Sequence, residues 1–289
     1  MPKLSEQSLA GRTVVVTGAS SGIGAAGAEE LGRRGAEVVP VGRDSGRLAA
    51  VTERIDNAAE PLTADFASLT EVRSLAERLL ERHPQIHVLV NNAGTVTGRR
   101  ELSEDGYEMV FAVNHLAPFL LTNLLLDRLR ESAPARVVTT SSIAHGQGQV
   151  DLDNLQLERG WSWSRAYGNS KLANVLFTRA LARRLDGSGV VANCFHPGTV
   201  RTRIARDTGL LRSLAWKAAT MFASSPARGA ETLVYLAASP EAAEVSGEYF
   251  VDSKPGRTAG RARDDEKAER LWEASEDLTG LGESAKPSE

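Results

Sequence analysis

Two residues one helical turn apart, Tyr167 and Lys171, carry the functional groups of a proton-transfer site. Side chains at positions i and i+4 of a helix share a face, with their Cβ atoms about 5–6 Å apart. A lysine ammonium at that distance favours the ionised form of a phenol and would lower its pKa from an ordinary value of about 10. A tyrosine tuned in this way could donate a proton to a substrate oxygen, or accept one, near neutral pH.

The pair alone has little predictive value, because tyrosine and lysine meet at this spacing on many helices by chance. It gains significance from a glycine-rich run, T-G-A-S-S-G-I-G, at 17–24. Gly18, Gly22 and Gly24 would follow a first strand and begin a first helix, which is the context of a dinucleotide-binding loop. Without Cβ atoms the backbone can approach a pyrophosphate, to which the helix N-terminus offers free N–H groups. The alternative is an ordinary tight turn.

The end of the second expected strand, V-P-V-G-R, bears on which dinucleotide would bind. An NAD site usually places a carboxylate there on the ribose 2′-hydroxyl, whereas an arginine suits the 2′-phosphate of NADP. Gly42 occupies the position of the acid, Arg43 follows it, and Arg47 is a candidate second phosphate contact. The pattern favours NADP(H), and the nearby Asp44 keeps NAD(H) as the alternative.

Short β-branched runs alternate with longer helical patterns along the chain, as in repeated βα units around a parallel sheet. We expect one α/β domain over 1–289, with a core at about 9–252 and a tail at about 253–289. Its fold would be a Rossmann-like doubly wound parallel sheet of about seven strands, with helices on both faces. The expected strands are Thr13–Thr17, Glu37–Val41, Pro61–Ala64, Val88–Asn91, Arg136–Thr140, Val190–Phe195 and Glu248–Val251. The expected helices are Ile23–Arg34, Leu69–Arg82, Tyr107–Arg130, Arg165–Leu185 and, in the tail, Asp264–Leu278, which Gly280 would end.

Two segments, 144–164 and 202–226, interrupt this alternation after the carboxyl ends of strands, where ligands bind in open α/β sheets. Aromatic residues form only 5% of the chain. Their presence in both segments predicts an apolar pocket for a largely hydrophobic substrate, with 202–226 as a lid. The alternative is that they pack the segments onto the core. His145 would flank the pocket, as a structural residue rather than a proton donor. The aromatic candidates are Trp161, Trp163, Trp216 and Phe222.

Composition argues against several classes of function. A net charge of −3 over 289 residues gives no basis for a nucleic-acid or anionic-membrane partner. The N-terminus has no apolar secretory signal, and the single cysteine, Cys194, cannot form an internal disulfide, so we expect a cytoplasmic protein. The five histidines show no metal-ligand spacing, and we expect no metal site.

The motifs together resemble those of the short-chain dehydrogenase/reductase family. After the glycine loop come, in the family's order, A-D-F at 64–66, N-N-A-G at 91–94, V-V-T-T-S-S at 137–142, Y-G-N-S-K at 167–171 and H-P-G-T-V-R-T at 196–202. The runs F-A-V-N-H-L-A-P-F-L-L-T and S-S-I-A-H, and the spacing of 25 between Ser142 and Tyr167, look most like the retinol-dehydrogenase-like group. The chain departs from that group in lacking its hydrophobic N-terminal anchor, which argues against a membrane-borne retinoid as the expected substrate.

The resemblance implies a role for each matching residue. Ser142 would donate a hydrogen bond to the substrate oxygen, Tyr167 would be the general acid or base, and Lys171 would lower its pKa and hold the nicotinamide ribose. The implied catalytic residues are Asn114, Ser142, Tyr167 and Lys171. The implied cofactor contacts are Gly18, Ser20, Ser21, Gly22, Ile23, Gly24, Arg43, Asp65, Phe66, Asn91, Asn92, Ala93, Gly94, Tyr167, Lys171, Pro197, Gly198, Val200 and Thr202.

Asn114 would lie in a helix that also contains Pro118, four residues later. Proline has no N–H with which to bond the Asn114 carbonyl, so this oxygen is free for another donor. The resemblance implies a water there, in a proton relay that reaches Lys171. A kink that only improves packing is an equal alternative.

The resemblance thus implies an NADP(H)-dependent carbonyl reductase or alcohol dehydrogenase for a largely hydrophobic substrate, as a homodimer or homotetramer. Two rivals remain on the same fold. One is a redox-sensing NADP-binding regulator without turnover, and the other is a structural partner in a larger assembly. The intact set of Ser142, Tyr167 and Lys171 argues against the sensor, because a sensor has no need of a tuned phenol.

Overall fold

A computed structural model of the chain describes residues 9–198 and 225–281. Within them the strands form one eight-stranded sheet in the order β3-β2-β1-β4-β5-β6-β7-β8, parallel except where β8 meets β7. Successive strands run outward from β1 to β3 and then from β4 to β8, so ligands are expected where β1 meets β4. The bounds are β1 (Thr13–Thr17), β2 (Glu37–Gly42), β3 (Leu62–Thr63), β4 (Val88–Asn91), β5 (Ala135–Thr140), β6 (Val190–His196), β7 (Tyr249–Val251) and β8 (Lys254–Pro255). The expected doubly wound parallel sheet is confirmed. The eighth strand, β8, was not expected, because its two residues, K-P, have no strand pattern.

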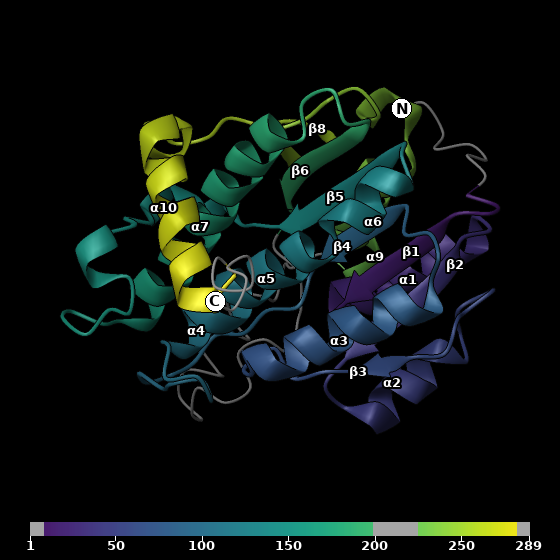
Figure 1. Cartoon of the computed structure of the whole chain (residues 1–289), viewed down its shortest axis with the longest axis horizontal. Coiled ribbons are helices and arrows are strands. Elements are labelled where there is room, and N and C mark those ends of the chain that lie inside the picture. The colour runs from purple at the N-terminus through teal and green to yellow at the C-terminus, as the bar shows by residue number, and fades with distance from the viewer. Residues whose placement is uncertain (1–8, 199–224, 282–289) are drawn as a thin grey trace, which may run out of the picture.

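Helices cover both faces of the sheet, and successive strand residues face opposite layers. In β1, Val15 joins the hydrophobic cluster beneath α3, α5 and α7, whereas Val14 and Val16 join the cluster beneath α1 and α9. Figure 1 shows α3 and α5 in front of the strands and α9 behind them. The bounds are α1 (Gly22–Arg33), α2 (Ser45–Thr52), α3 (Leu69–Arg82), α5 (Ala117–Leu124), α7 (Trp163–Arg184) and α9 (Pro226–Ala238). Sequence reasoning missed α2 and α9.

The long helix expected over Tyr107–Arg130 is present over 109–131, but a π-helical turn and a break at 125 interrupt its α-helical pattern. The segment consists of α4 (Met109–Phe111), a π-helical turn (Ala112–Leu116), α5 and α6 (Leu126–Glu131). The turn is closed by a bond from the Ala117 N–H to the Ala112 carbonyl, five residues back. Pro118 follows at the start of α5, where its missing N–H and ring disfavour an ordinary helical turn. Asn114 therefore lies in a π turn, a feature frequent at functional sites.

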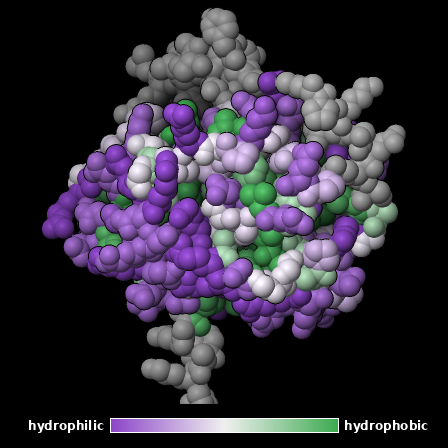
Figure 2. All heavy atoms as spheres, turned by 90° about the horizontal axis from the view of Figure 1, so that it is seen from above, coloured by the Kyte–Doolittle hydropathy of each residue, from purple (hydrophilic) through white to green (hydrophobic). Residues whose placement is uncertain are grey.

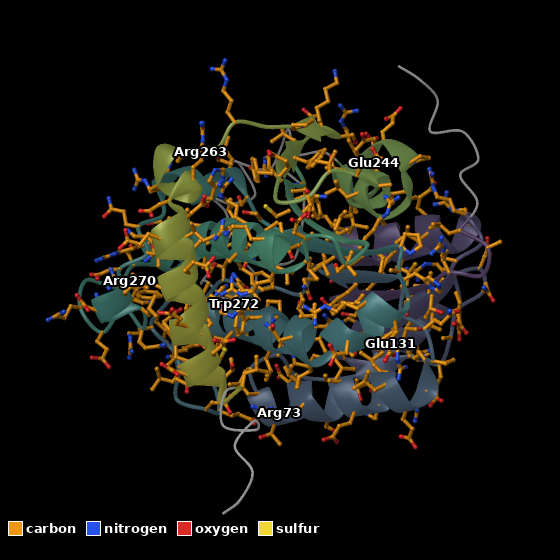
Figure 3. The ribbon with its side chains drawn as sticks, turned by 45° about the horizontal axis from the view of Figure 1, so that its top comes forward. Arg73, Glu131, Glu244, Arg263, Arg270 and Trp272 are labelled. Atoms are coloured by element: carbon orange, nitrogen blue, oxygen red, sulfur yellow. The ribbon has the colours of Figure 1, made fainter. Side chains whose placement is uncertain are left out.

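The tail forms α10 (Asp265–Thr279), which ends at Gly280 with a positive φ of 61°, as expected. It lies across α7 (Figure 1), and its Trp272 points inward (Figure 3). There the indole meets Phe119 and Phe177, with ring centroids 4.9 and 5.8 Å away. The face seen in Figure 2 is mostly hydrophilic, with a smaller group of hydrophobic side chains. Short 3₁₀ turns complete the fold at Ile143–Gln147, Leu152–Asn154, Pro240–Ala242 and Gly260–Arg263.

Candidate active site

A cavity of about 430 Å³ lies at the carboxyl ends of β1, β2, β3 and β4. This is where an open α/β sheet binds a nucleotide. Eleven of the predicted cofactor residues line it: Gly18, Ser20, Ser21, Gly22, Ile23, Arg43, Asp65, Phe66, Asn92, Ala93 and Gly94. Arg47, the candidate second phosphate contact, also lines it, as do Gly42 and Asp44 at the end of β2. Sequence reasoning had not assigned the other lining residues to the site: Ala64, Thr95, Met109 and Val113.

The glycine loop is packed too closely to accept side chains. A Cβ on Gly18, whose φ is +68°, would lie 2.9 Å from the Ala93 Cα, and one on Gly24 would lie 2.4 Å from the Gly18 carbonyl oxygen. Gly24 thus stands behind the cavity and supports the loop. The loop backbone is left exposed to a pyrophosphate, so the residues present fit a dinucleotide.

The glycine loop is joined to the N-N-A-G run by Thr17, a role that sequence reasoning missed. Its hydroxyl accepts hydrogen bonds from the backbone N–H groups of Asn92 and Ala93, at 2.9 and 3.1 Å, and donates to the Val90 carbonyl at 3.1 Å. Asn91 is buried beneath and donates to the Thr122 hydroxyl at 2.8 Å. Asn91 therefore supports the cavity floor from below.

Two arginines after the end of β2, Arg43 and Arg47, line the cavity. Arg43 is 76% exposed and its Nη1 is 3.5 Å from the Asp65 carboxylate, while Arg47 pairs with Asp44 at 3.0 Å. Exposed pairs of this kind contribute about 0–1 kcal/mol, so both arginines can exchange their partners for a phosphate at little cost. A Cβ on Gly42 would lie 3.2 Å from Ser20, so this strand end is also crowded.

Lys171 and Asn114 meet beside Gly94, at the inner end of the cavity. A Cβ on Gly94 would lie 3.2 Å from the Asn114 Oδ1 and 3.9 Å from the Lys171 Nζ. Lys171 is 4% exposed and donates to the Thr140 carbonyl at 3.0 Å, and burial lowers its pKa to about 8. Asn114 exchanges two hydrogen bonds with the Thr95 backbone, at 2.7 and 3.1 Å. The structure therefore brings these two predicted residues together against Gly94, which lines the cavity.

The expected lowering of the Tyr167 pKa by Lys171 is wrong for this structure. Burial raises the pKa of Tyr167, and a hydrogen bond with the Ser142 side chain opposes the rise. The Lys171 Nζ lies 5.6 Å from the centroid of the Tyr167 ring and is bonded to the Thr140 carbonyl. The ammonium thus lies over the tyrosine ring at the distance of a cation–π contact, and its hydrogen bond goes to the Thr140 carbonyl.

Ser142 is held through the polar turn that follows it. Its side chain accepts from the Ala144 N–H at 3.2 Å, and its carbonyl accepts from the His145 Nδ1 at 2.7 Å. The His145 ring packs edge-on against Tyr249, 4.6 Å between centroids, and burial lowers the pKa of His145. His145 lies beside the predicted catalytic serine as a neutral ring.

The predicted substrate aromatics and the cofactor residues after β6 lie partly within and partly outside the described residues. Trp161 is partly buried and packs with Tyr167 on a small cluster, whereas Trp163, at the start of α7, is 41% exposed. Pro197 and Gly198 follow β6, and Gly198 has a φ of +78°. Residues 199–224 lie outside the described residues. That range contains Val200, Thr202, Trp216, Phe222 and nearly all of the expected lid.

Over 9–198 and 225–281, no group of three or more His, Cys, Asp or Glu side chains could hold a metal ion. Across the same ranges, no helix combines the length and apolar character needed to cross a membrane. A second cavity, of about 350 Å³, lies between the 152–158 segment and α10 and contains none of the predicted site residues.

The pattern of the short chain dehydrogenase family matches residues 12–210 of the chain. The chain belongs to this family. It is therefore an oxidoreductase that uses an NAD(P) cofactor, as the sequence motifs implied. Human retinol dehydrogenase 13 is 42% identical, over 96% of this chain and 87% of its own. Mouse retinol dehydrogenase 12 is 44% identical, over 94% of this chain and 87% of its own.

Two solved structures have the same fold as this chain. An uncharacterized protein from Mycobacterium paratuberculosis has a TM-score of 0.79 and 36% identity, covering 94% of this chain and 95% of its own. The RhlG/NADP active-site complex from Pseudomonas aeruginosa has a TM-score of 0.69 and 31% identity, covering 85% and 96%. The expected resemblance to the family and to its retinol-dehydrogenase-like group is confirmed.

Proposed function

We propose that this short-chain dehydrogenase is NADP(H)-dependent and transfers hydride between the nicotinamide and the carbonyl or alcohol carbon of a largely hydrophobic substrate. The observation that carries the proposal is the position of Gly94. It lines the nucleotide cavity and lies against both Asn114 and Lys171. A cofactor in that cavity would have its reactive end beside the predicted proton-transfer residues.

Each residue contributes one element of the chemistry. The dinucleotide, when bound, supplies the hydride in reduction or accepts it in oxidation. The Ser142 hydroxyl holds the substrate oxygen and stabilises the charge that develops there. Tyr167 donates its phenolic proton to that oxygen in reduction, and the phenolate recovers the same proton in oxidation. Lys171, charged below about pH 8, would hold the nicotinamide ribose.

The preference for NADP(H) is supported by Arg43 and Arg47 at the rim and by glycine at position 42, where an NAD site would carry an acid. Asp44 is engaged twice within its own turn, by the Arg47 side chain and by the Arg47 N–H. An acid committed to a helix N-cap is poorly placed to accept a ribose hydroxyl as well. This commitment favours NADP(H) over NAD(H).

A hydrophobic alcohol or aldehyde as substrate is supported by the names of the relatives, which are retinol dehydrogenases. The partly buried indole of Trp161, packed beside Tyr167, gives that side of the site an apolar wall. We infer a small-molecule substrate with a long apolar portion rather than a sugar or a small acid.

The decisive experiment is a screen of the purified protein against hydrophobic alcohols, aldehydes and ketones, with NADPH and NADH followed separately. Turnover should be faster with the phosphorylated cofactor. Tyr167→Phe should lower kcat by about 10²- to 10⁴-fold, because the acid is removed and the ring is kept. Its dissociation constant for NADPH should stay within about twofold, since only one hydroxyl is removed. Undiminished turnover would reject Tyr167, and NADPH binding without turnover on any substrate would favour the sensor.

A further inference from the structure

We propose that Glu108 is a positioning residue for this reaction. Its buried carboxylate would hold Trp161, and with it the first turn of α7 that carries Tyr167, against the helical segment that carries Asn114. The inference rests on the proposed function, in which Tyr167 transfers the proton, and adds a residue that none of the catalytic motifs contains.

Glu108 is 1% exposed and every part of it is engaged. Its Oε2 accepts from the Phe111 N–H at 2.8 Å and so caps α4, and its Oε1 accepts from the Trp161 Nε1 at 3.1 Å. Its own N–H donates to the Gln156 side chain at 2.7 Å. One residue thus joins the start of α4 to two points of the 144–164 segment, which lies some 50 residues further along the chain.

Trp161 transmits this contact to Tyr167. The indole stands two residues before α7 begins at Trp163, next to the Ser162 N-cap. It packs on a small cluster that contains Ala166, the residue before Tyr167, and the Tyr167 ring packs on the same cluster. Fixing the indole therefore fixes the direction in which α7 begins and the surface on which the tyrosine ring rests.

A second contact joins the segment that carries Asn114 to α7, at Ser170, three residues beyond Tyr167. The Asn114 Nδ2 donates to the Ser170 hydroxyl at 3.0 Å, and that hydroxyl donates to the Tyr167 carbonyl at 2.9 Å. The 108–114 segment is therefore tied to α7 on both sides of Tyr167, by Glu108 through Trp161 and by Asn114 through Ser170.

A carboxylate is a costly way to fill a buried position, because burying it requires hydrogen bonds to replace its water. An apolar side chain would pack there without that demand, so the carboxylate adds two directional contacts, to the Phe111 N–H and to the indole. Proton transfer requires heavy atoms within about 2.6–3.2 Å. A misplacement of about 1 Å can cost about 100-fold in rate.

The first test is Trp161→Phe, which removes the indole N–H and keeps an aromatic ring. We expect kcat to fall about 10- to 100-fold, with the dissociation constant for NADPH within about twofold because the nucleotide cavity lies elsewhere. The matched control is Trp272→Phe on α10, which also removes an indole–glutamate bond, to Glu276 at 2.8 Å. The control should lower the unfolding midpoint and leave kcat unchanged.

The second test compares Glu108→Gln with Glu108→Ala. The amide keeps one acceptor and the alanine keeps none, so kcat should decrease in the order wild type, glutamine, alanine. Hydrogen–deuterium exchange, which needs no turnover, should become faster in peptides covering 161–170 and stay the same in those covering α1. If alanine prevents folding, the glutamine and Trp161→Phe variants carry the test.

The proposal is overturned if Trp161→Phe and Glu108→Gln lower the unfolding midpoint but keep wild-type kcat. It is equally overturned if exchange over 161–170 is unchanged, whatever the activity. A wild-type protein without turnover on any substrate would refute the proposed function instead. In that case the exchange result still decides whether Glu108 orders the start of α7.

Discussion

Lys171 is buried among uncharged groups, and for this reason its pKa falls to about 8. The ammonium form predominates at pH 7 and is lost above about pH 8, rather than above its ordinary value of 10.5. Burial acts on Tyr167 in the opposite sense, because the charged form of a phenol is the deprotonated one. Burial thus shifts the pKa of each residue towards its neutral form, and a bound anionic dinucleotide would raise the pKa of Lys171 again.

This shift predicts a pH dependence of nucleotide binding. If the Lys171 ammonium holds the cofactor, the dissociation constant for NADPH should rise about tenfold between pH 7 and pH 9, as the amine loses its proton. Fluorescence titration with NADPH at a series of pH values measures this dissociation constant. The Lys171→Met variant carries no charge at this position at either pH. It should bind NADPH weakly, with a dissociation constant that does not change between pH 7 and pH 9. A wild-type profile equally flat across this range would show that the ammonium makes no contribution.

Arg43 should determine the preference for the phosphorylated cofactor. Arg43→Ala should raise the KM for NADPH about 10- to 100-fold, because a hydrogen bond to a charged group contributes about 1.5–3 kcal/mol. The KM for NADH should stay within about twofold. Arg54→Ala is the control, since Arg54 is exposed and pairs with Glu29 at 2.9 Å, outside the cavity. Equal effects on both cofactors would show that Arg43 does not contact a 2′-phosphate.

At the scale of elements, the π turn at Ala112–Leu116 is the feature that places Asn114. Its side chain holds the Thr95 backbone at the cavity and reaches Ser170 on α7. The following Pro118 cannot offer an N–H to the Asn114 carbonyl. This geometry suits a proton relay through the Asn114 carbonyl, and it equally suits a kink that only improves packing. Substitution of Pro118 distinguishes the two.

Pro118→Ala restores an N–H that can bond the Asn114 carbonyl. If that oxygen serves a proton relay, kcat should fall about tenfold, which is within the range of a lost proton-transfer contact. The unfolding midpoint should be unchanged or higher, because alanine is the better helix former by about 3 kcal/mol. Steady-state kinetics and thermal unfolding measure the two effects. Full activity in the variant would leave packing as the only role of the kink.

At the scale of the whole molecule, α10 is bound to the core by polar contacts as well as by Trp272. The buried His115, in the π turn, meets the Ser275 hydroxyl of α10 at 3.0 Å and the Asn174 side chain of α7 at 3.4 Å. Arg184 lies 4.0 Å over the Trp272 ring. The outer face of α7 is thus covered by the chain's own tail, so we expect any homodimer or homotetramer to use another surface.

His115 should make this packing sensitive to acid. Burial lowers its pKa to about 4, below the ordinary 6.5, so the unfolded chain binds the proton more readily. Stability is therefore lost as pH falls through this window, by about 2 kcal/mol between pH 7 and pH 5. Urea unfolding at both values measures the difference. The His115→Phe variant has no titrating side chain at this position, so its loss of unfolding free energy between pH 7 and pH 5 should be smaller by about 2 kcal/mol. The same loss in both proteins would contradict the assignment to His115.

The sequence alone determined the parallel sheet and the nucleotide loop, because both depend on local patterns. Apolar runs specify strands covered on both faces, and Gly18 and Gly24 stand where a Cβ would meet the backbone at less than 3 Å. The bounds of α3 and β4 were predicted to the residue. These features need no knowledge of distant neighbours.

Only the tertiary structure decided the π turn around Asn114, the direction of the Tyr167 pKa and the contact between Glu108 and Trp161. The pKa of Tyr167 and the contact between Glu108 and Trp161 depend on side chains far apart in the chain, such as the 53 positions that separate Glu108 from Trp161. The i and i+4 spacing correctly placed Tyr167 and Lys171 on one helix, but it carries no information on burial. Burial is set by the whole packed domain, and in this site it changes the proton affinities of both residues.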